Sequence, residues 1–191
     1  MSTVDRARNA SDSELLADLT RGGDAGARAW PVLVTRHSPT LYAVARSFQL
    51  DRETAEDLVQ TAWLRLLERA GQVRDAGALG AWLCAIVRNE ARRLLARRRE
   101  IPAVLELEQR PDGGEALDVG LLDGERARAL RLAFARLGEE CQRLLRLLLA
   151  EPRLSYDEIA AALGRPRGSL GPTRRRCLEQ LRSRLPKGFE P

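Results

Sequence analysis

Apolar residues recur at helical spacing along almost the whole chain, and this periodicity is what most constrains its fold. We find no convincing alternation of apolar and polar residues of the kind that marks a strand. Aromatic residues make up only 4% of the chain, so its cores must be built mainly from leucine, alanine and valine. Cores of this kind suit small helical bundles. The sequence therefore predicts an all-α protein.

Caps and breakers divide the periodic stretches into nine expected helices. Pro31 falls inside the second of them, and Pro39 suits the first turn of the third, where a missing N–H costs little. The expected helices are a short one between Ser11 and Gly22, then 24–37, 39–48, 51–69 and 78–98, followed by 123–137, 139–150, 155–163 and 169–185.

Residues 100–122 are rich in proline, glycine and acidic side chains, a composition typical of a linker. The sequence thus predicts two small helical domains, 13–99 and 123–185, joined by a flexible acidic linker.

Positive charge is concentrated in two stretches of the chain. The net charge is +5 and the pI is about 9.8, and arginines crowd residues 88–99 and 165–184 on either side of the acidic connector. Two basic patches separated in this way favour two contacts with one nucleic acid, although such runs can also be ordinary solvated helix faces.

The segment 155–185 has the pattern of a helix-turn-helix. Ser155 and Glu158 form a capping box that begins a short helix, a Gly- and Pro-containing turn follows it, and Ser169 is placed to cap a longer basic helix. The outward face of that second helix would enter a major groove, where arginine pairs with guanine or grips phosphates. The alternative is an amphipathic helix with a charged outer face.

Two helices of the first half carry further candidate contacts. On helix 78–98, Arg88 and Arg92 lie one turn apart and would follow a phosphate backbone, Asn89 could hydrogen-bond a base, and Trp82 is either a core residue or a stacking surface for an unpaired base. On helix 51–69, Leu64 lies among polar residues opposite the apolar stripe, as a partner contact or as a single exposed leucine.

The chain shows no pattern typical of an enzyme, a metalloprotein or a membrane protein. Cys84, Cys141 and Cys177 are widely spaced and His37 is the only histidine, so we expect buried apolar cysteines and neither a zinc site nor a disulfide framework. There is no phosphate-binding glycine loop and no nucleophile with a plausible base, and no cofactor is expected. The polar start and the absence of an apolar run of about 20 residues predict a cytoplasmic protein without membrane insertion.

Two sets of motifs resemble one known family. Residues 55–66 (AEDLVQTAWLRL), 81–83 (AWL) and 88–91 (RNEA) resemble the promoter-melting domain of the extracytoplasmic-function (ECF) sigma factors. Residues 154–160 (LSYDEIA), 163–164 (LG) and 166–170 (PRGSL) resemble their C-terminal domain. Both sets occur in the family's order and at its spacing, and the resemblance covers about residues 13–99 and 123–185.

The resemblance implies a promoter-recognition subunit of bacterial RNA polymerase. Its implied partners are the clamp helices of the largest polymerase subunit, the flap of the second-largest subunit, promoter DNA and, as for many relatives, an anti-sigma factor. The implied polymerase contacts are Asp57, Gln60, Thr61 and Leu64. Those to the −10 element are Arg74, Trp82, Arg88, Asn89, Arg92 and Arg93, and those to the −35 element are Arg167, Ser169, Thr173, Arg174, Arg175 and Arg176.

This chain departs from the family pattern at two places. Many relatives have an acidic residue where Thr61 stands, which weakens the expectation for that contact. At the start of the recognition helix, Gly171, Pro172 and Thr173 replace more usual basic or polar residues, so fewer direct base contacts are expected there.

Two other functions remain open at this point. A stand-alone helix-turn-helix regulator would bind duplex DNA tightly without polymerase, usually as a dimer, but it leaves the first-domain motif unexplained. A polymerase-binding adaptor would bind core polymerase and fail to support transcription.

Overall fold

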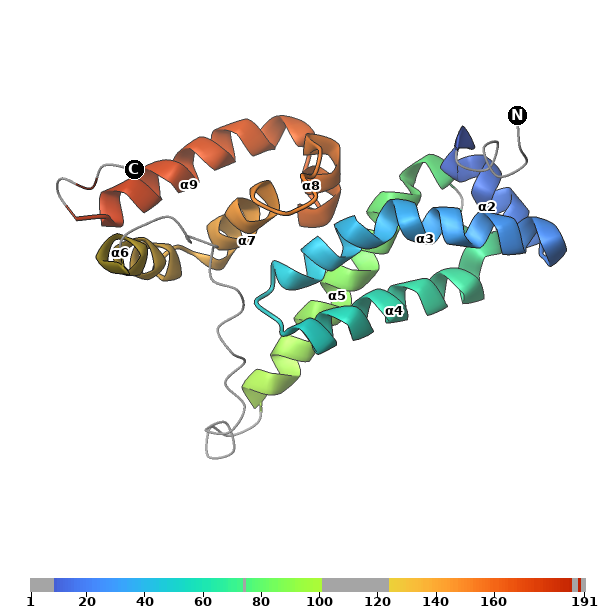
Figure 1. Ribbon diagram of the computed structural model, residues 1–191, viewed down its shortest axis with the longest axis horizontal. Coiled ribbons are helices and arrows are strands. Elements are labelled where there is room, and N and C mark those ends of the chain that lie inside the picture. Colours follow the sequence, from blue (N-terminus) through green and yellow to red (C-terminus); the bar gives the residue numbers. More distant parts are fainter. Residues whose placement is uncertain (1–8, 74, 101–123, 187–188, 190–191) are drawn as a thin grey trace.

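The computed structural model describes residues 9–73, 75–100, 124–186 and 189, and every regular element within them is helical (Figure 1). The expected all-α fold is confirmed for this part of the chain. The α-helices are α2 (Asp12–Arg21), α3 (Gly23–Arg46), α4 (Arg52–Arg69), α5 (Leu79–Glu100), α6 (Gly124–Ala135), α7 (Glu139–Leu148), α8 (Tyr156–Leu163) and α9 (Leu170–Arg184). Short 3₁₀ helices occupy Ala70–Gln72 (η1), Ala76–Ala78 (η2) and Arg167–Ser169 (η4).

Side-chain caps fix where several helices begin. The Ser155 hydroxyl accepts a hydrogen bond from the Glu158 backbone N–H at 3.2 Å, and the Glu158 carboxylate accepts one from the Ser155 backbone N–H at 2.8 Å. This is the predicted capping box. Asp51 caps α4 by accepting from the Thr54 backbone N–H at 2.8 Å. The sequence located both helix starts correctly because capping is a local interaction.

Helix α3 corrects the prediction of two helices, 24–37 and 39–48. It is one helix of 24 residues with Pro31 and Pro39 inside it. Each proline removes a backbone hydrogen bond and crowds the preceding turn. Leu33 precedes Pro39 and Leu41 follows it, and both are completely buried in the same core. Burial on both sides of Pro39 keeps the helix continuous.

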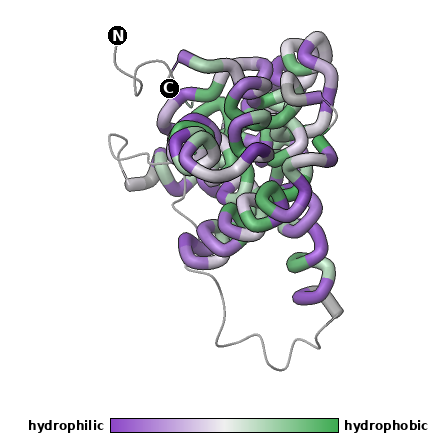
Figure 2. The backbone as a smooth tube through the Cα atoms, turned by 90° about the vertical axis from the view of Figure 1, so that its right-hand side faces the viewer, coloured by the Kyte–Doolittle hydropathy of each residue, from purple (hydrophilic) through white to green (hydrophobic). Residues whose placement is uncertain are grey.

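Helices α2 to α5 form the first group, with a core of leucine, alanine and valine. The predicted apolar stripe of α4 is buried at Ala55, Ala62 and Leu66. Trp63 of α4 meets Trp30 of α3 edge-to-face, with 5.4 Å between the ring centroids. Hydrophobic and hydrophilic residues alternate along each helical coil (Figure 2), as expected for helices with one buried face.

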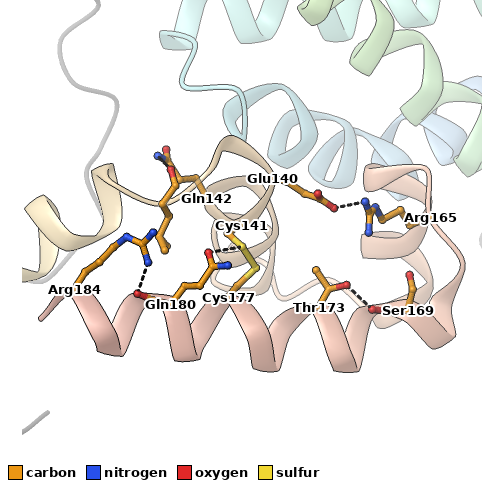
Figure 3. The surroundings of a disulfide bond; sticks show 10 residues. Glu140, Cys141, Gln142, Arg165, Ser169, Thr173, Cys177, Gln180 and Arg184 are labelled. Carbon is orange, nitrogen blue, oxygen red and sulfur yellow. Dashed lines mark hydrogen bonds and ion pairs between the residues drawn. A yellow bond between two sulfur atoms is a disulfide. The ribbon is translucent and has the colours of Figure 1, made fainter.

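Helices α6 to α9 form the second group, and a disulfide crosses it. Cys141 of α7 and Cys177 of α9 are bonded, with their Cα atoms 5.3 Å apart (Figure 3). The expectation that the cysteines would be unpaired buried filler is therefore wrong for these two. They lie 36 residues apart in sequence, and only the folding of α9 back onto α7 brings them together.

Cys84 matches the expectation of a buried apolar cysteine. It is free and 1% exposed. Burial raises the pKa of its thiol to about 12, so the thiol is neutral and unreactive at ordinary pH.

Helix α8 joins the two groups by packing on α5 and α3 (Figure 1). The Thr40 hydroxyl of α3 donates to the Glu158 carboxylate of α8 at 2.6 Å, and the Gln49 amide donates to the Gln142 side-chain oxygen of α7 at 3.1 Å. The predicted linker lies almost wholly outside the described residues. Among those described, no helix is long and apolar enough to cross a membrane.

Reduction of the disulfide is expected to lower the free energy of unfolding by about 3–4 kcal/mol, because the bond restricts a long loop of the unfolded chain. Urea unfolding followed by circular dichroism, with and without dithiothreitol, measures this difference. A Cys141→Ala/Cys177→Ala variant is the control and should be insensitive to the reductant. Identical wild-type curves in both conditions would show that the bond does not stabilise the fold.

Candidate nucleic-acid interface

The first half of α9 exposes three consecutive arginines, Arg174, Arg175 and Arg176. Helix α8 ends at Gly164, and η4 then leads into α9. Leu170 and Cys177 are buried and hold α9 against its own helix group. The arginines therefore stand on the outer side of a helix that is fixed from behind, as the sequence predicted for Arg175 and Arg176.

Two predicted −35 contacts of this helix have different roles in the structure. Thr173 is 8% exposed, and its hydroxyl donates to the Ser169 backbone carbonyl at 2.7 Å. It faces inward and is not available to DNA, because its spacing from Leu170 and Cys177 places it on the buried face. Ser169 does not cap α9, since its hydroxyl donates instead to the Pro166 carbonyl at 2.7 Å.

Neighbouring side chains orient the exposed arginines. The Arg174 guanidinium donates to the Tyr156 hydroxyl at 3.1 Å, and Arg175 donates to Glu179 at 2.9 Å. Arg167 forms an ion pair with Asp157 at 3.0 Å. Sequence analysis missed the role of Tyr156, because 18 residues separate it from Arg174. Exposed ion pairs of this kind are weak, so the arginines can exchange them for phosphates.

Helix α5 presents a second polar face. Asn89, Arg92 and Arg93 are exposed. The carboxylate of Glu90 lies 2.8 Å from Arg93 and 2.6 Å from Arg65 of α4. This ion-pair network holds one side of the face in place and leaves Asn89 and Arg92 open to solvent.

The remaining predicted −10 contacts are placed differently. Trp82 is partly buried and packs against the hydrophobic core. Arg74 lies outside the described residues. Arg88 does not continue the row of solvent-facing arginines, because its guanidinium donates to the Ala161 and Ala162 backbone carbonyls of α8 at 2.9 and 3.1 Å. Burial, with Arg92 nearby, lowers the pKa of this guanidinium.

Helix α4 carries a third exposed face made of the predicted polymerase contacts. Asp57 and Gln60 are exposed, and Thr61 is half-buried with its hydroxyl donating to the Asp57 carbonyl at 2.9 Å. Leu64 is 60% exposed, and Leu67, one turn further on, is 51% exposed. Leu67 extends this apolar surface. The sequence analysis did not single it out, although its i, i+3 spacing from Leu64 places the two leucines side by side on the helix.

A groove runs between α6 and α9, and Tyr156, Arg174 and Arg175 are among the polar residues that line it. Its apolar lining comes from Leu130 of α6 and from Leu178 and Leu181 of α9. Leu178 is 42% exposed. Within the described residues, no group of three or more His, Cys, Asp or Glu side chains could hold a metal ion.

Comparison with known proteins finds similarity to one family. Residues 33–101, which span most of α3 and all of α4 and α5, match the family model of sigma-70 region 2. The chain is 29% identical over 177 residues to the ECF RNA polymerase sigma factor SigE of Mycolicibacterium smegmatis. It is also 29% identical over 186 residues to the ECF RNA polymerase sigma factor BldN of Streptomyces coelicolor. These matches support an ECF sigma factor.

The similarity to these sigma factors extends along both helix groups. The SigE alignment covers 87% of this chain and 65% of SigE, and the BldN alignment covers 92% of this chain and 68% of BldN. The chain thus spans just under two thirds of SigE. Its fold is similar to that of the sigma factor RpoE from Bartonella quintana, solved in complex with the anti-sigma factor NepR, with a TM-score of 0.56. Sequence identity there is 23%, over 81% of this chain and 95% of RpoE.

Replacing Arg176 by alanine is expected to weaken binding to duplex DNA and to reduce the slope of log K against log salt by about 0.9, the effect of losing one phosphate contact. Fluorescence anisotropy with a labelled duplex across a salt series measures both. Arg184→Ala, in the last turn of α9, is the matched control with the same change in charge. Equal effects of the two variants would indicate attraction to net charge and not a defined face.

Proposed function

We propose that this sigma factor binds core RNA polymerase and directs promoter-specific initiation of transcription. The observation that carries the proposal is the presence of three exposed faces in one chain, in the family's order. They are the α4 face with Asp57 and Leu64, the α5 face with Asn89 and Arg92, and the α9 face with Arg174–Arg176. A stand-alone regulator would need only the last of these.

The α4 face would bind the clamp helices of the largest polymerase subunit. Leu64 and Leu67 give it an exposed apolar centre, and Asp57, Gln60 and Thr61 give it a polar rim. Protein–protein interfaces commonly have this arrangement of an apolar centre and a polar rim. The leucine-lined groove between α6 and α9 would receive the apolar flap element of the second-largest subunit.

The α5 face would hold the opened −10 element. Asn89 supplies donors and an acceptor for a base edge, and Arg92 and Arg93 supply charge for phosphates. Extruding a base costs a few kcal/mol, and stacking returns about 1–3 kcal/mol per base. Trp82 and Arg74, next to this face in sequence, complete the proposed −10 site.

The α9 face would contact the −35 element through Arg167, Ser169 and Arg174–Arg176. Thr173 supports this face from inside through its hydrogen bond to Ser169. Because Gly171 and Pro172 begin the exposed side of α9, phosphate contacts should outweigh base contacts there.

The proposed sigma factor has no catalysis of its own, acts in the cytoplasm where polymerase and chromosome meet, and uses no cofactor. RpoE of Bartonella quintana was solved with an anti-sigma factor, and we include such a protein among the partners proposed for this chain. It would inhibit by covering the α4 face or the arginine faces.

Replacing Leu64 by alanine is expected to weaken binding to purified core polymerase about tenfold, because truncating an apolar residue at an interface centre costs about 1–2 kcal/mol. Fluorescence anisotropy of the labelled chain titrated with core polymerase measures the affinity. Arg69→Ala is the matched control, since Arg69 is exposed on the same helix but about 120° around its axis from Asp57. A wild-type chain that ignores core polymerase and binds duplex DNA tightly would replace this proposal with the stand-alone regulator.

A further inference from the structure

We propose that Asp12 and His37 position the first turn of α5, and with it Trp82, for the capture of an unpaired −10 base. The proposal rests on the proposed function, of which it explains one part. Neither positioning residue belongs to the three exposed faces already described. Helix α2 thereby acts on the −10 site through other helices.

The Asp12 carboxylate joins the start of α2 to the middle of α3. One of its oxygens accepts a hydrogen bond from the Arg36 guanidinium at 2.6 Å, and the other lies 2.9 Å from Nε2 of His37. Arg36 also donates to the Ala10 backbone carbonyl at 2.9 Å. The Asp12 and His37 side chains are only 20% and 14% exposed, so solvent screens their contact less than it screens an exposed ion pair. The start of α2 is therefore fixed on α3.

The ring of His37 lies between Asp12 and the first turn of α5. A Cβ added at Gly80 would lie 3.3 Å from Cε1 and 3.4 Å from Nδ1 of this ring. A side chain at this position would press on the ring, whereas glycine lets α5 pack directly against it. Trp82 follows two residues later and is partly buried against the core. His37 therefore contacts both Asp12 and the turn that carries Trp82.

Helix α2 also supports the segment that enters α5. It packs against η1 and η2, which lie between α4 and α5 in the chain (Figure 1). The Thr20 methyl group lies 3.8 Å from the position of a Cβ on Gly71. Leu15 and Leu16 are buried and anchor α2 in the core. The entry to α5 is therefore supported by α2 as well as by His37.

Base capture places a stricter demand on this contact than folding does. The core is built from apolar residues, and a partly exposed ion pair adds little to the stability of a fold. An aromatic ring, in contrast, gains its stacking energy with a base only when the two planes face each other. Side chains that bind a ligand need neighbours that hold them to within about 0.5 Å. Loss of the Asp12 contact should therefore loosen Trp82 while the core stays folded.

Fluorine NMR of the chain labelled with 5-fluorotryptophan tests the physical link without polymerase. Three tryptophans give three resonances, and Trp82→Phe assigns one of them. Asp12→Ala and His37→Ala should shift and broaden the Trp82 resonance. The resonances of Trp30 and Trp63, which pack against each other in the first helix group, should not move and so confirm the fold. An unchanged Trp82 resonance in both variants would overturn the positioning role.

Binding of a fork-junction promoter by core polymerase carrying this chain tests the functional consequence. The promoter is one that the wild-type chain uses, and a second probe has an abasic site at one unpaired −10 position. The measured quantity is the Kd for the abasic probe divided by the Kd for the intact probe. Asp12→Ala should lower this ratio about fivefold at the captured base, because part of the stacking on Trp82 is lost. Asp12→Glu, which keeps the carboxylate, should restore most of it.

Asp18→Ala is the matched control. It removes the same charge from α2 but breaks an exposed ion pair with Arg21 near the other end of the helix, so the ratio should not change. A merely structural defect would weaken binding of both probes equally and also leave the ratio unchanged.

Two results would overturn the proposal in different ways. A wild-type ratio above one that stays the same in Asp12→Ala, or falls equally in Asp18→Ala, would overturn the positioning role and leave the proposed function standing. A wild-type ratio of one at every unpaired position would contradict the proposed −10 site itself, and the positioning role would fall with it.

Discussion

The packing of α5 between two groups of helices determines how the rest of the molecule is arranged. Its apolar face, with Leu83, Val87 and Ala91 completely buried, builds the core with α3 and α4. Its other side meets α8, where Arg88 binds the helix end. The exposed remainder of α5 is the candidate face for the −10 element. One helix therefore carries the core of the first group, the contact between the groups and a proposed DNA site, and a change in the docking of α8 necessarily changes that site.

Local interactions could be predicted from the sequence, and long-range ones could not. The Ser155 capping box and the Asp51 cap involve residues three positions apart, and the buried stripe of α4 follows from helical periodicity alone. The continuity of α3 through Pro39 depends on burial against other helices. The disulfide joins residues 36 positions apart, and Arg88 contacts Ala161 across 73 positions. Neither contact can be predicted from a local sequence pattern, because both depend on how the helices pack together.

The candidate sites show the same division. Helical spacing correctly placed Asp57, Leu64, Arg92 and Arg175 on outer faces, because exposure follows from position around a helix. Thr173 was assigned to DNA from its place in a motif, but its spacing from Leu170 and Cys177 puts it inside. The proposed activity needs no reacting group. It depends on three exposed surfaces, on α4, α5 and α9. The packing of these helices decides which arginines are accessible to DNA.

Run-off transcription with purified core RNA polymerase from the source bacterium tests the central claim most directly. Fragmented genomic DNA is the template, and the transcripts are sequenced at their 5′ ends, with and without this chain. We predict discrete starts that depend on the chain and share two upstream motifs at a fixed spacing. Starts that are unchanged by the chain, although it binds core polymerase, would contradict the proposed role in initiation and favour an adaptor.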